Sequence, residues 1–261
     1  MKMKNEEHQL GLPIEYQLLP EFFDAHNVNE QTDIKNALIE KLLKEQGVKT
    51  ILDMACGTGS QVFFLNERGY EIVGSDFSPV LLNIARNKAK KLNCNLHFID
   101  GDMRHIKIGK FDAVITIFNA IGHLTKTDFK KALRNIRFNL NDHGVYVFDI
   151  FNQQAITDDI IDSFNMEIDS IVNGARIHNL QYSEIDRENN LLISYDHYTI
   201  FKDGLTPEVR TNRFSLQIYT AEELQALLNN AGFKIIGLYD MDGNNFDADK
   251  SLNMLIVARG A

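Results

Sequence analysis

The sequence is poor in cysteine, in basic charge and in long apolar runs. Its 261 residues include two cysteines, Cys56 and Cys94, whose positions form neither a disulfide framework nor a metal-ligand spacing. A formal net charge of −9 repels nucleic acids and anionic membranes. No run approaches the roughly 18 apolar residues of a membrane span, and the amino terminus lacks the apolar stretch of a signal peptide. We therefore expect a soluble cytoplasmic protein that binds neither nucleic acid nor membrane.

Short apolar segments alternate with segments of helical periodicity through the first 150 residues. This alternation predicts crossover units and a parallel sheet covered by helices on both faces. One helix start is marked by Ser78 as N-cap followed by Pro79. The predicted strands span residues 50–53, 71–76, 96–100, 111–118 and 144–151, and the helices span 32–46, 60–68, 79–91 and 126–140.

The periodicity changes after residue 152. Residues 165–219 carry period-2 segments separated by turn residues, which predicts an inserted antiparallel β-meander of about four strands. In the segment 191–201, Leu191 and every second residue after it share one face, and we expect His197 to be packed on that face. Helical periodicity returns at Thr220, where Thr220 and Glu223 form a capping box, and two terminal strands then form a hairpin.

A glycine turn follows the first predicted strand, in the stretch "DMACGTG" at residues 53–59. A phosphate-binding loop needs Lys and then Ser or Thr after the second glycine, but Ser60 and Gln61 follow Gly59. A dinucleotide fingerprint has a third glycine where this chain has Val62, which argues against NAD without excluding it. Asp76 ends the second strand, 17 residues after Gly59, where a carboxylate can accept hydrogen bonds from a ribose diol.

The joint pattern of "DMACGTG", Asp76 in "GSDFSP" and "GDM" at 101–103 resembles the class I S-adenosylmethionine-dependent methyltransferases. The resemblance implies a Rossmann-like α/β fold with a seven-stranded, mostly parallel sheet. It assigns residues 1–152 and 220–261 to the cofactor-binding domain and 165–219 to the insertion. It also implies S-adenosylmethionine as cofactor, with no metal, and the following cofactor residues: Asp53, Ala55, Cys56, Gly57, Gly59, Asp76, Phe77, Gly101, Asp102, Met103 and Phe118.

Each of these assignments has a structural alternative. By the resemblance, Asp76 binds the ribose hydroxyls and Asp102 the adenine amine, yet both can simply cap the turns that follow them. Phe77 and Met103 pack against adenine or belong to the core. Cys56 is expected to be a buried filler and not a reactive thiol.

The acceptor side is sought at the ends of the fourth and fifth strands. The turn "IFNAIGHL" lacks the Pro-Pro-Tyr element of nucleic-acid N-methyltransferases and is similar to small-molecule N-methyltransferases of aminosugars and of glycine or sarcosine. His123, as a base or an orienting group, and Tyr16, closing over the cofactor, are the candidate catalytic residues. Helix capping by His123 and core packing of Tyr16 are the alternatives. Asp149 is a candidate for attracting an amine or for a structural hydrogen bond.

Two arginines, Arg210 and Arg213, are candidates for binding an anionic acceptor or for surface ion pairs. The β-meander is expected either to roof the acceptor pocket or to join two subunits as a homodimer. The leading hypothesis is methyl transfer to a small-molecule acceptor, with an amine nitrogen favoured. The alternatives are an O-methyltransferase with His123 as base, a non-catalytic S-adenosylmethionine-binding protein and, third, a nicotinamide oxidoreductase.

Overall fold

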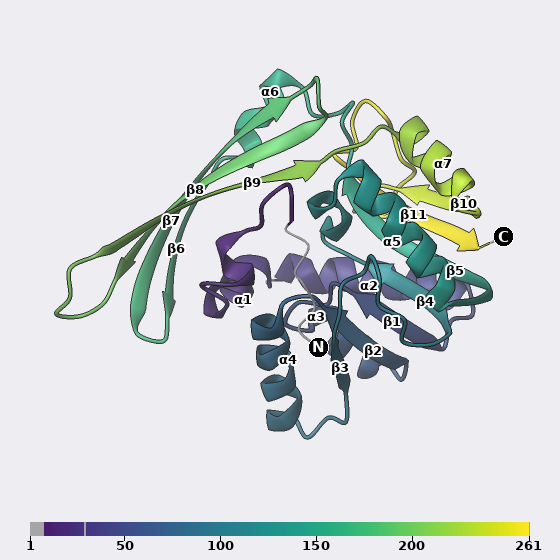
Figure 1. The fold of residues 1–261 in the computed structure, drawn as a ribbon, viewed down its shortest axis with the longest axis horizontal. Coiled ribbons are helices and arrows are strands. Elements are labelled where there is room, and N and C mark those ends of the chain that lie inside the picture. Colours follow the sequence, from purple (N-terminus) through teal and green to yellow (C-terminus); the bar gives the residue numbers. More distant parts are fainter. Residues whose placement is uncertain (1–7, 29, 261) are drawn as a thin grey trace.

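Seven strands form one twisted sheet in the larger part of the molecule (Figure 1). The computed structural model describes residues 8–28 and 30–260. The strand order is β10-β11-β5-β4-β1-β2-β3, in which β3, β2, β1, β4 and β5 are parallel and β11 is antiparallel to both β5 and β10. This order confirms the predicted fold class. The strands are β1 (Thr50–Met54), β2 (Glu71–Asp76), β3 (His97–Asp100), β4 (Phe111–Thr116), β5 (Leu140–Phe151), β10 (Phe233–Tyr239) and β11 (Asn253–Gly260).

Helices cover both faces of this sheet because successive strand residues point to opposite sides. Ile51 belongs to one core cluster and its neighbour Leu52 to the other, and both are fully buried. The first cluster packs the sheet against α2 (Glu30–Glu45), α3 (Ser60–Asn66) and α4 (Pro79–Lys91), and the second packs it against α5 (Lys126–Asn139) and α7 (Ala221–Asn230). Ser78 caps α4, and Thr220 with Glu223 forms the predicted capping box of α7.

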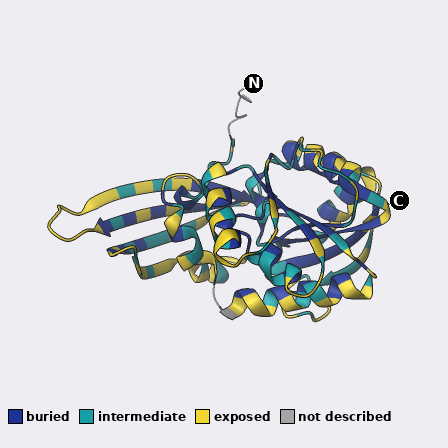
Figure 2. Ribbon diagram, turned by 90° about the horizontal axis from the view of Figure 1, so that it is seen from below, coloured by how far each residue is buried: buried dark blue, intermediate teal, exposed yellow. Residues whose placement is uncertain are grey.

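A second sheet, the β-meander, projects from one end of the first (Figure 1). Its antiparallel strands are β6 (Met166–Val172), β7 (Ala175–Asp186), β8 (Leu191–Phe201) and β9 (Glu208–Gln217), in that order. Two short helical turns, α6 (Asp158–Ile161) and η3 (Asp162–Phe164), lead into it. The hairpins at its free end are exposed, whereas the central strands of the larger sheet are buried (Figure 2). The four-stranded antiparallel prediction is confirmed.

The expected burial of β8 is wrong. His197 and Tyr195 are exposed, and the buried face is the opposite one, which carries Leu192, Tyr198 and Ile200. Tyr198 and Ile200 on this face pack against the amino-terminal turns η1 (Ile14–Tyr16) and α1 (Glu21–Asn27), whereas Leu192 packs in a separate cluster with Phe214 and Leu216 of β9. The amino-terminal turns, and not the alternation of apolar residues in β8, therefore determine which face of β8 is covered.

The amino-terminal segment 8–16, here called the strap, links the two sheets. The backbone N–H of Ser215 in β9 donates to the Leu10 carbonyl at 2.7 Å, and Ser78 Oγ at the start of α4 donates to the Tyr16 carbonyl at 2.6 Å. Gly11 has a positive φ of 73°, and a Cβ there would lie 2.8 Å from the Arg213 carbonyl oxygen. The strap therefore follows β9 closely only because residue 11 is glycine. Within the described residues, no helix is long and apolar enough to cross a membrane.

Candidate active site

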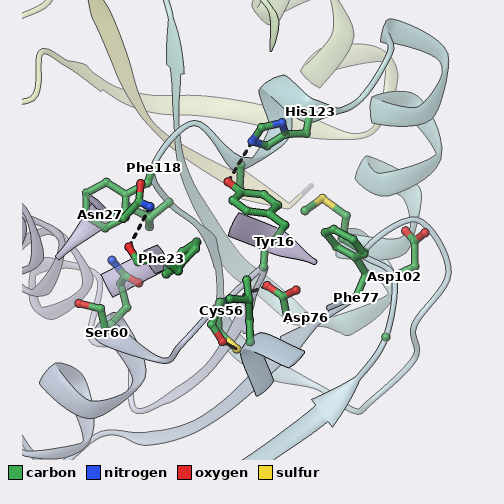
Figure 3. A pocket seen from close by; sticks show the side chains of 18 of the residues that line it. Tyr16, Phe23, Asn27, Cys56, Ser60, Asp76, Phe77, Asp102, Phe118 and His123 are labelled. Atoms are coloured by element: carbon green, nitrogen blue, oxygen red, sulfur yellow. Dashed lines mark hydrogen bonds between the residues drawn. The ribbon is translucent and has the colours of Figure 1, made fainter. Parts of the chain in front are cut away.

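A pocket lies at the carboxyl ends of β1, β2 and β4, under the strap (Figure 3). In an open α/β sheet this edge is where ligands bind. Nine of the eleven cofactor candidates and both catalytic candidates line it, whereas Asp53 and Gly59 do not. The lining candidates are Ala55, Cys56, Gly57, Asp76, Phe77, Gly101, Asp102, Met103, Phe118, Tyr16 and His123.

The turn after β1 brings bare backbone to the pocket surface. Gly57 has a φ of 53°, and a Cβ on it would lie 2.9 Å from the ring of Phe23 in α1. Ala55 also has a positive φ, 75°, and Gly59 is the left-handed N-cap of α3. Gly57 is required here by both conformation and space, as the sequence indicated.

Asp76 is held by the turns on either side of it. Its Oδ2 accepts the backbone N–H of Gly57 and its Oδ1 that of Ser78, both at 2.8 Å. Burial raises the pKa of Asp76 to about 6 although these backbone N–H groups favour the ionised form. The carboxylate also lines the pocket, so its remaining lone pairs can accept hydrogen bonds from ligand hydroxyls.

Asp53 is buried behind this surface. Burial raises the pKa of its carboxyl group well above the ordinary value, and the nearby Asp76 adds to the effect. Among the described residues, its Oδ2 has no hydrogen-bond partner.

Asp102 is bound by an arginine that the sequence analysis missed. Arg104 Nε lies 2.9–3.0 Å from the two Asp102 oxygens, and its Nη1 donates to Asp128 at 2.9 Å. Burial would raise the pKa of Asp102, but the hydrogen bonds from Arg104 outweigh it and lower the pKa. Arg104 directly follows the recognised motif, and its contact with α5 could not be inferred from spacing.

Tyr16 and His123 meet across the pocket from the strap and from η2 (Ala120–His123). Tyr16 Oη lies 3.1 Å from His123 Nε2 (Figure 3). Burial, with a further contribution from His8, lowers the pKa of His123 to about 3, so its imidazole is neutral at physiological pH. Burial raises the pKa of Tyr16, and the carboxylates of Glu15 and Asp76 raise it further.

Three more lining residues come from segments that carried no motif: His8, Phe23 and Asn27. The His8 ring lies 4.5 Å from that of Phe77. Burial lowers the pKa of His8, as does nearby Arg104. Only the fold reveals these residues, because the strap and α1 are distant in sequence from the strand ends they cover.

Asp149 and Asn152 make structural hydrogen bonds. The Asp149 oxygens accept the backbone N–H of Asn119 at 3.1 and 3.2 Å, and Asn152 donates to the carbonyls of Ala248 and Ser251. Phe118 and Asn119 both have positive φ, 62° and 55°, and Asp149 stabilises this strained turn.

The two candidate arginines make surface contacts. Arg210 pairs with Glu208 at 2.6 Å, and Arg213 lies over the Tyr195 ring. Within the described part of the chain, no cluster of His, Cys, Asp and Glu side chains could hold a metal ion.

The comparisons with known proteins agree with this geometry. Residues 51–144 match the family model described as a methyltransferase domain. The chain is an S-adenosylmethionine-dependent methyltransferase. Its cofactor is S-adenosylmethionine, which the pocket fits: the glycine turn permits close approach, and a carboxylate stands at the end of β2.

Relatives of this methyltransferase differ in how much of it they match. YqeM of Bacillus subtilis, provisionally named a methyltransferase, is 28% identical over 76% of this chain and 77% of its own length. A glycine/sarcosine N-methyltransferase of Parasynechococcus marenigrum is 33% identical, over 49% of this chain and 47% of the relative. The latter match therefore spans about half of either protein.

Solved structures match the whole methyltransferase, β-meander included. A sugar N-methyltransferase from a Streptoalloteichus species has a TM-score of 0.77 and 19% identity, covering 100% of this chain and 96% of its own. An amino pentose methyltransferase from Micromonospora echinaspora has a TM-score of 0.70 and 18% identity, with 93% and 97% covered. At these identities the likeness is one of fold.

Proposed function

We propose that this methyltransferase transfers the methyl group to an amine nitrogen of a small molecule. In this proposal Asp76 accepts hydrogen bonds from the ribose hydroxyls, and Asp102 accepts one from the adenine amine. Phe77 and Met103 pack on the adenine faces, and the turn at Gly57 surrounds the methionine moiety. Tyr16 and His123 position the acceptor.

The choice of nitrogen is carried by one observation: among the described residues, no strong base lies at the Tyr16–His123 end of the pocket. His123, the candidate base, has a pKa of about 3, and the pKa of His8 is also lowered. A hydroxyl acceptor needs a general base whose pKa lies near the working pH, whereas a free amine attacks through its own lone pair. This weighs against the O-methyltransferase alternative that uses His123 as base.

The lining charges favour an amine without a neighbouring anionic group. Among the described residues that line the pocket there is no lysine or arginine, and two carboxylates are present. A carboxylate or phosphate beside the amine would have no cationic partner there. The amine-bearing sugars named for the full-length structural neighbours fit this pocket better than glycine or sarcosine.

We propose further that the β-meander roofs the acceptor pocket. His123 lies 6.1 Å, between ring centroids, from Phe214 on β9, and the strap is hydrogen-bonded to the same strand. If the β-meander roofs the pocket of its own chain, the pocket is complete without a second subunit. Sedimentation velocity, with activity measured at the concentrations used, tests whether the active species is a monomer or a homodimer.

The function is tested with acceptors that differ in one group. The purified protein is incubated with methyl-labelled S-adenosylmethionine and with an aminosugar, the sugar carrying hydroxyl in its place, glycine, or sarcosine. We expect methyl transfer to the aminosugar nitrogen, with little to the other three. Transfer to the hydroxyl sugar would overturn the nitrogen assignment, and no turnover with intact cofactor binding would favour the non-catalytic alternative.

A further inference from the structure

Three rings meet at the acceptor end of the pocket, and they are here called the ring cluster: Tyr16, Phe23 and His123. The Tyr16 ring centroid lies 5.2 Å from that of His123 and 5.7 Å from that of Phe23. All three rings line the same pocket, and Tyr16 lies between the other two in Figure 3. They come from the strap, α1 and η2, so three separate segments place aromatic surface at one point.

A buried carboxylate adds negative charge behind these rings. Glu15 is 5% exposed, and its Oε1 accepts the hydroxyl hydrogen of Tyr198 at 2.5 Å. Its negative charge acts on two of these residues. It raises the pKa of Tyr16, as burial also does, and it raises the pKa of His123, which burial lowers. With a neutral imidazole at position 123, no cation is found among the described residues that line this end of the pocket.

We propose that the ring cluster, with Glu15 behind it, holds the acceptor amine and stabilises the alkylammonium charge that its nitrogen acquires on methylation. This deepens the proposed N-methyltransferase function and rests on it. S-adenosylmethionine supplies a methyl group on sulfonium sulfur: the nitrogen lone pair bonds to the methyl carbon, the carbon–sulfur bond breaks, and its electron pair stays on sulfur. The positive charge thereby passes to the nitrogen, which lies against the rings.

Aromatic faces suit this task better than a direct carboxylate contact. A carboxylate touching the nitrogen would stabilise its protonated form, which has no lone pair with which to attack. A ring face attracts the cation through its quadrupole and requires no N–H donor. The ring cluster therefore accepts a primary amine substrate and also its secondary and tertiary amine products. Each ammonium product releases a proton to solvent before its nitrogen can attack again, and successive methylation of one nitrogen follows.

The test uses two probes of the same shape and different charge. Choline carries a trimethylammonium group, and 3,3-dimethylbutan-1-ol carries a neutral tert-butyl group in its place. Binding of each is measured by titration calorimetry to the complex with S-adenosylhomocysteine. We expect choline to bind about tenfold more tightly or better, the effect of more than one cation–π contact.

Two variants assign this preference to the named residues. Phe23→Leu keeps apolar volume and removes one ring face, and Glu15→Gln keeps an acceptor for Tyr198 and removes the charge. Each should reduce the choline preference by about threefold or more. Phe138→Leu is the matched control, because Phe138 lies on α5, 45% exposed, beside Lys107 and Lys110. It should leave the preference unchanged.

The outcomes separate the two proposals. Equal binding of the two probes, or binding of neither, to a protein that binds S-adenosylhomocysteine overturns the alkylammonium site and leaves methyl transfer standing. A preference that survives both variants also overturns it. Failure to bind S-adenosylhomocysteine overturns the cofactor assignment and the inference together.

Discussion

The two sheets differ in how their residues are buried. In the seven-stranded sheet, adjacent residues such as Val147 and Phe148 are both fully buried, because helices cover both faces. In the β-meander, Tyr198 is fully buried while Tyr195 on the same strand is 38% exposed. The central strands of the larger sheet are buried on both faces, whereas the β-meander has an exposed face.

This difference suggests to us that the two sheets have different roles at the pocket. The turns of the larger sheet present Asp76, the glycine turn and Asp102, which are fixed by backbone hydrogen bonds or ion pairs. The β-meander reaches the pocket through the strap, which places Tyr16 there. We infer that cofactor binding depends on the first sheet and acceptor selection on the second.

The largest effect should come from Asp76→Ala. It removes the proposed ribose acceptor and leaves two backbone N–H groups unpaired, which should cost about 1–3 kcal/mol and weaken S-adenosylhomocysteine binding about 5- to 150-fold. Titration calorimetry measures this. The matched control is Asp112→Ala, because Asp112 also accepts two backbone N–H groups but lies at the opposite end of the sheet. Equal loss of affinity in both variants would contradict a local role for Asp76.

Cofactor binding should also depend on pH through the same carboxyl group. Its pKa is about 6, so protonation below that pH removes an acceptor oxygen, and the Kd for S-adenosylhomocysteine should rise by up to about tenfold per pH unit. The stability of the ligand-free protein depends on pH in the opposite direction. Because folding raises this pKa, the free energy of unfolding should fall as pH rises from about 4 to 6. Asp76→Asn should give a flat Kd, and a wild-type Kd constant from pH 5 to 8 would contradict the assignment.

A smaller and more selective effect is expected from Tyr16→Phe. It removes the hydroxyl that contacts His123, and it should lower kcat/KM for the acceptor about tenfold while leaving S-adenosylhomocysteine affinity within about twofold. Steady-state kinetics and calorimetry separate the two readouts. Tyr182→Phe, on an exposed tyrosine of β7, is the control. A matching loss of cofactor affinity would break the division between the sheets.

Gly11→Ala tests the connection between strap and β-meander. Its positive φ costs about 1–2 kcal/mol for alanine, and the added Cβ also meets the Arg213 carbonyl. Gly174→Ala is matched in φ, at 79°, with no atom within 4 Å of the new Cβ. We expect Gly11→Ala to lower Tm more than Gly174→Ala, with about 2–4 °C for each further kcal/mol, and to raise the acceptor KM. Equal Tm values would show that the strap adjusts without cost.

The smallest effect should be that of His197→Ala, within about 0.5 kcal/mol of wild type because the side chain is exposed. Tyr198→Phe, one residue further along β8, should cost about 1–3 kcal/mol because Glu15 loses its hydrogen bond. Urea unfolding at pH 7 measures both. Comparable values would mean that the two faces of β8 are not distinct in energy.

The sequence predicted the larger sheet well because its signals are local. The glycine turn, the Ser78 cap and the apolar strands each specify structure within a few residues. The burial of β8 was not predictable in this way, since Leu191 and Ile193 make one face apolar and Leu192 and Ile200 the other. Packing of α1 decides between them, and that contact joins segments about 180 residues apart in sequence. His8 and Phe23 escaped notice for the same reason, and Arg104 did so because its contact with Asp128 joins segments 24 residues apart.

The strap has a mechanical consequence. It is hydrogen-bonded to β9 through Leu10 and to the start of α4 through the Tyr16 carbonyl, with only five residues of chain between these two anchors. Since so short a segment has little slack, a tilt of the β-meander away from the larger sheet must either break one anchor or draw the Tyr16 ring out of the pocket. If the β-meander is the roof proposed above, then opening it with both anchors intact also withdraws the Tyr16 ring.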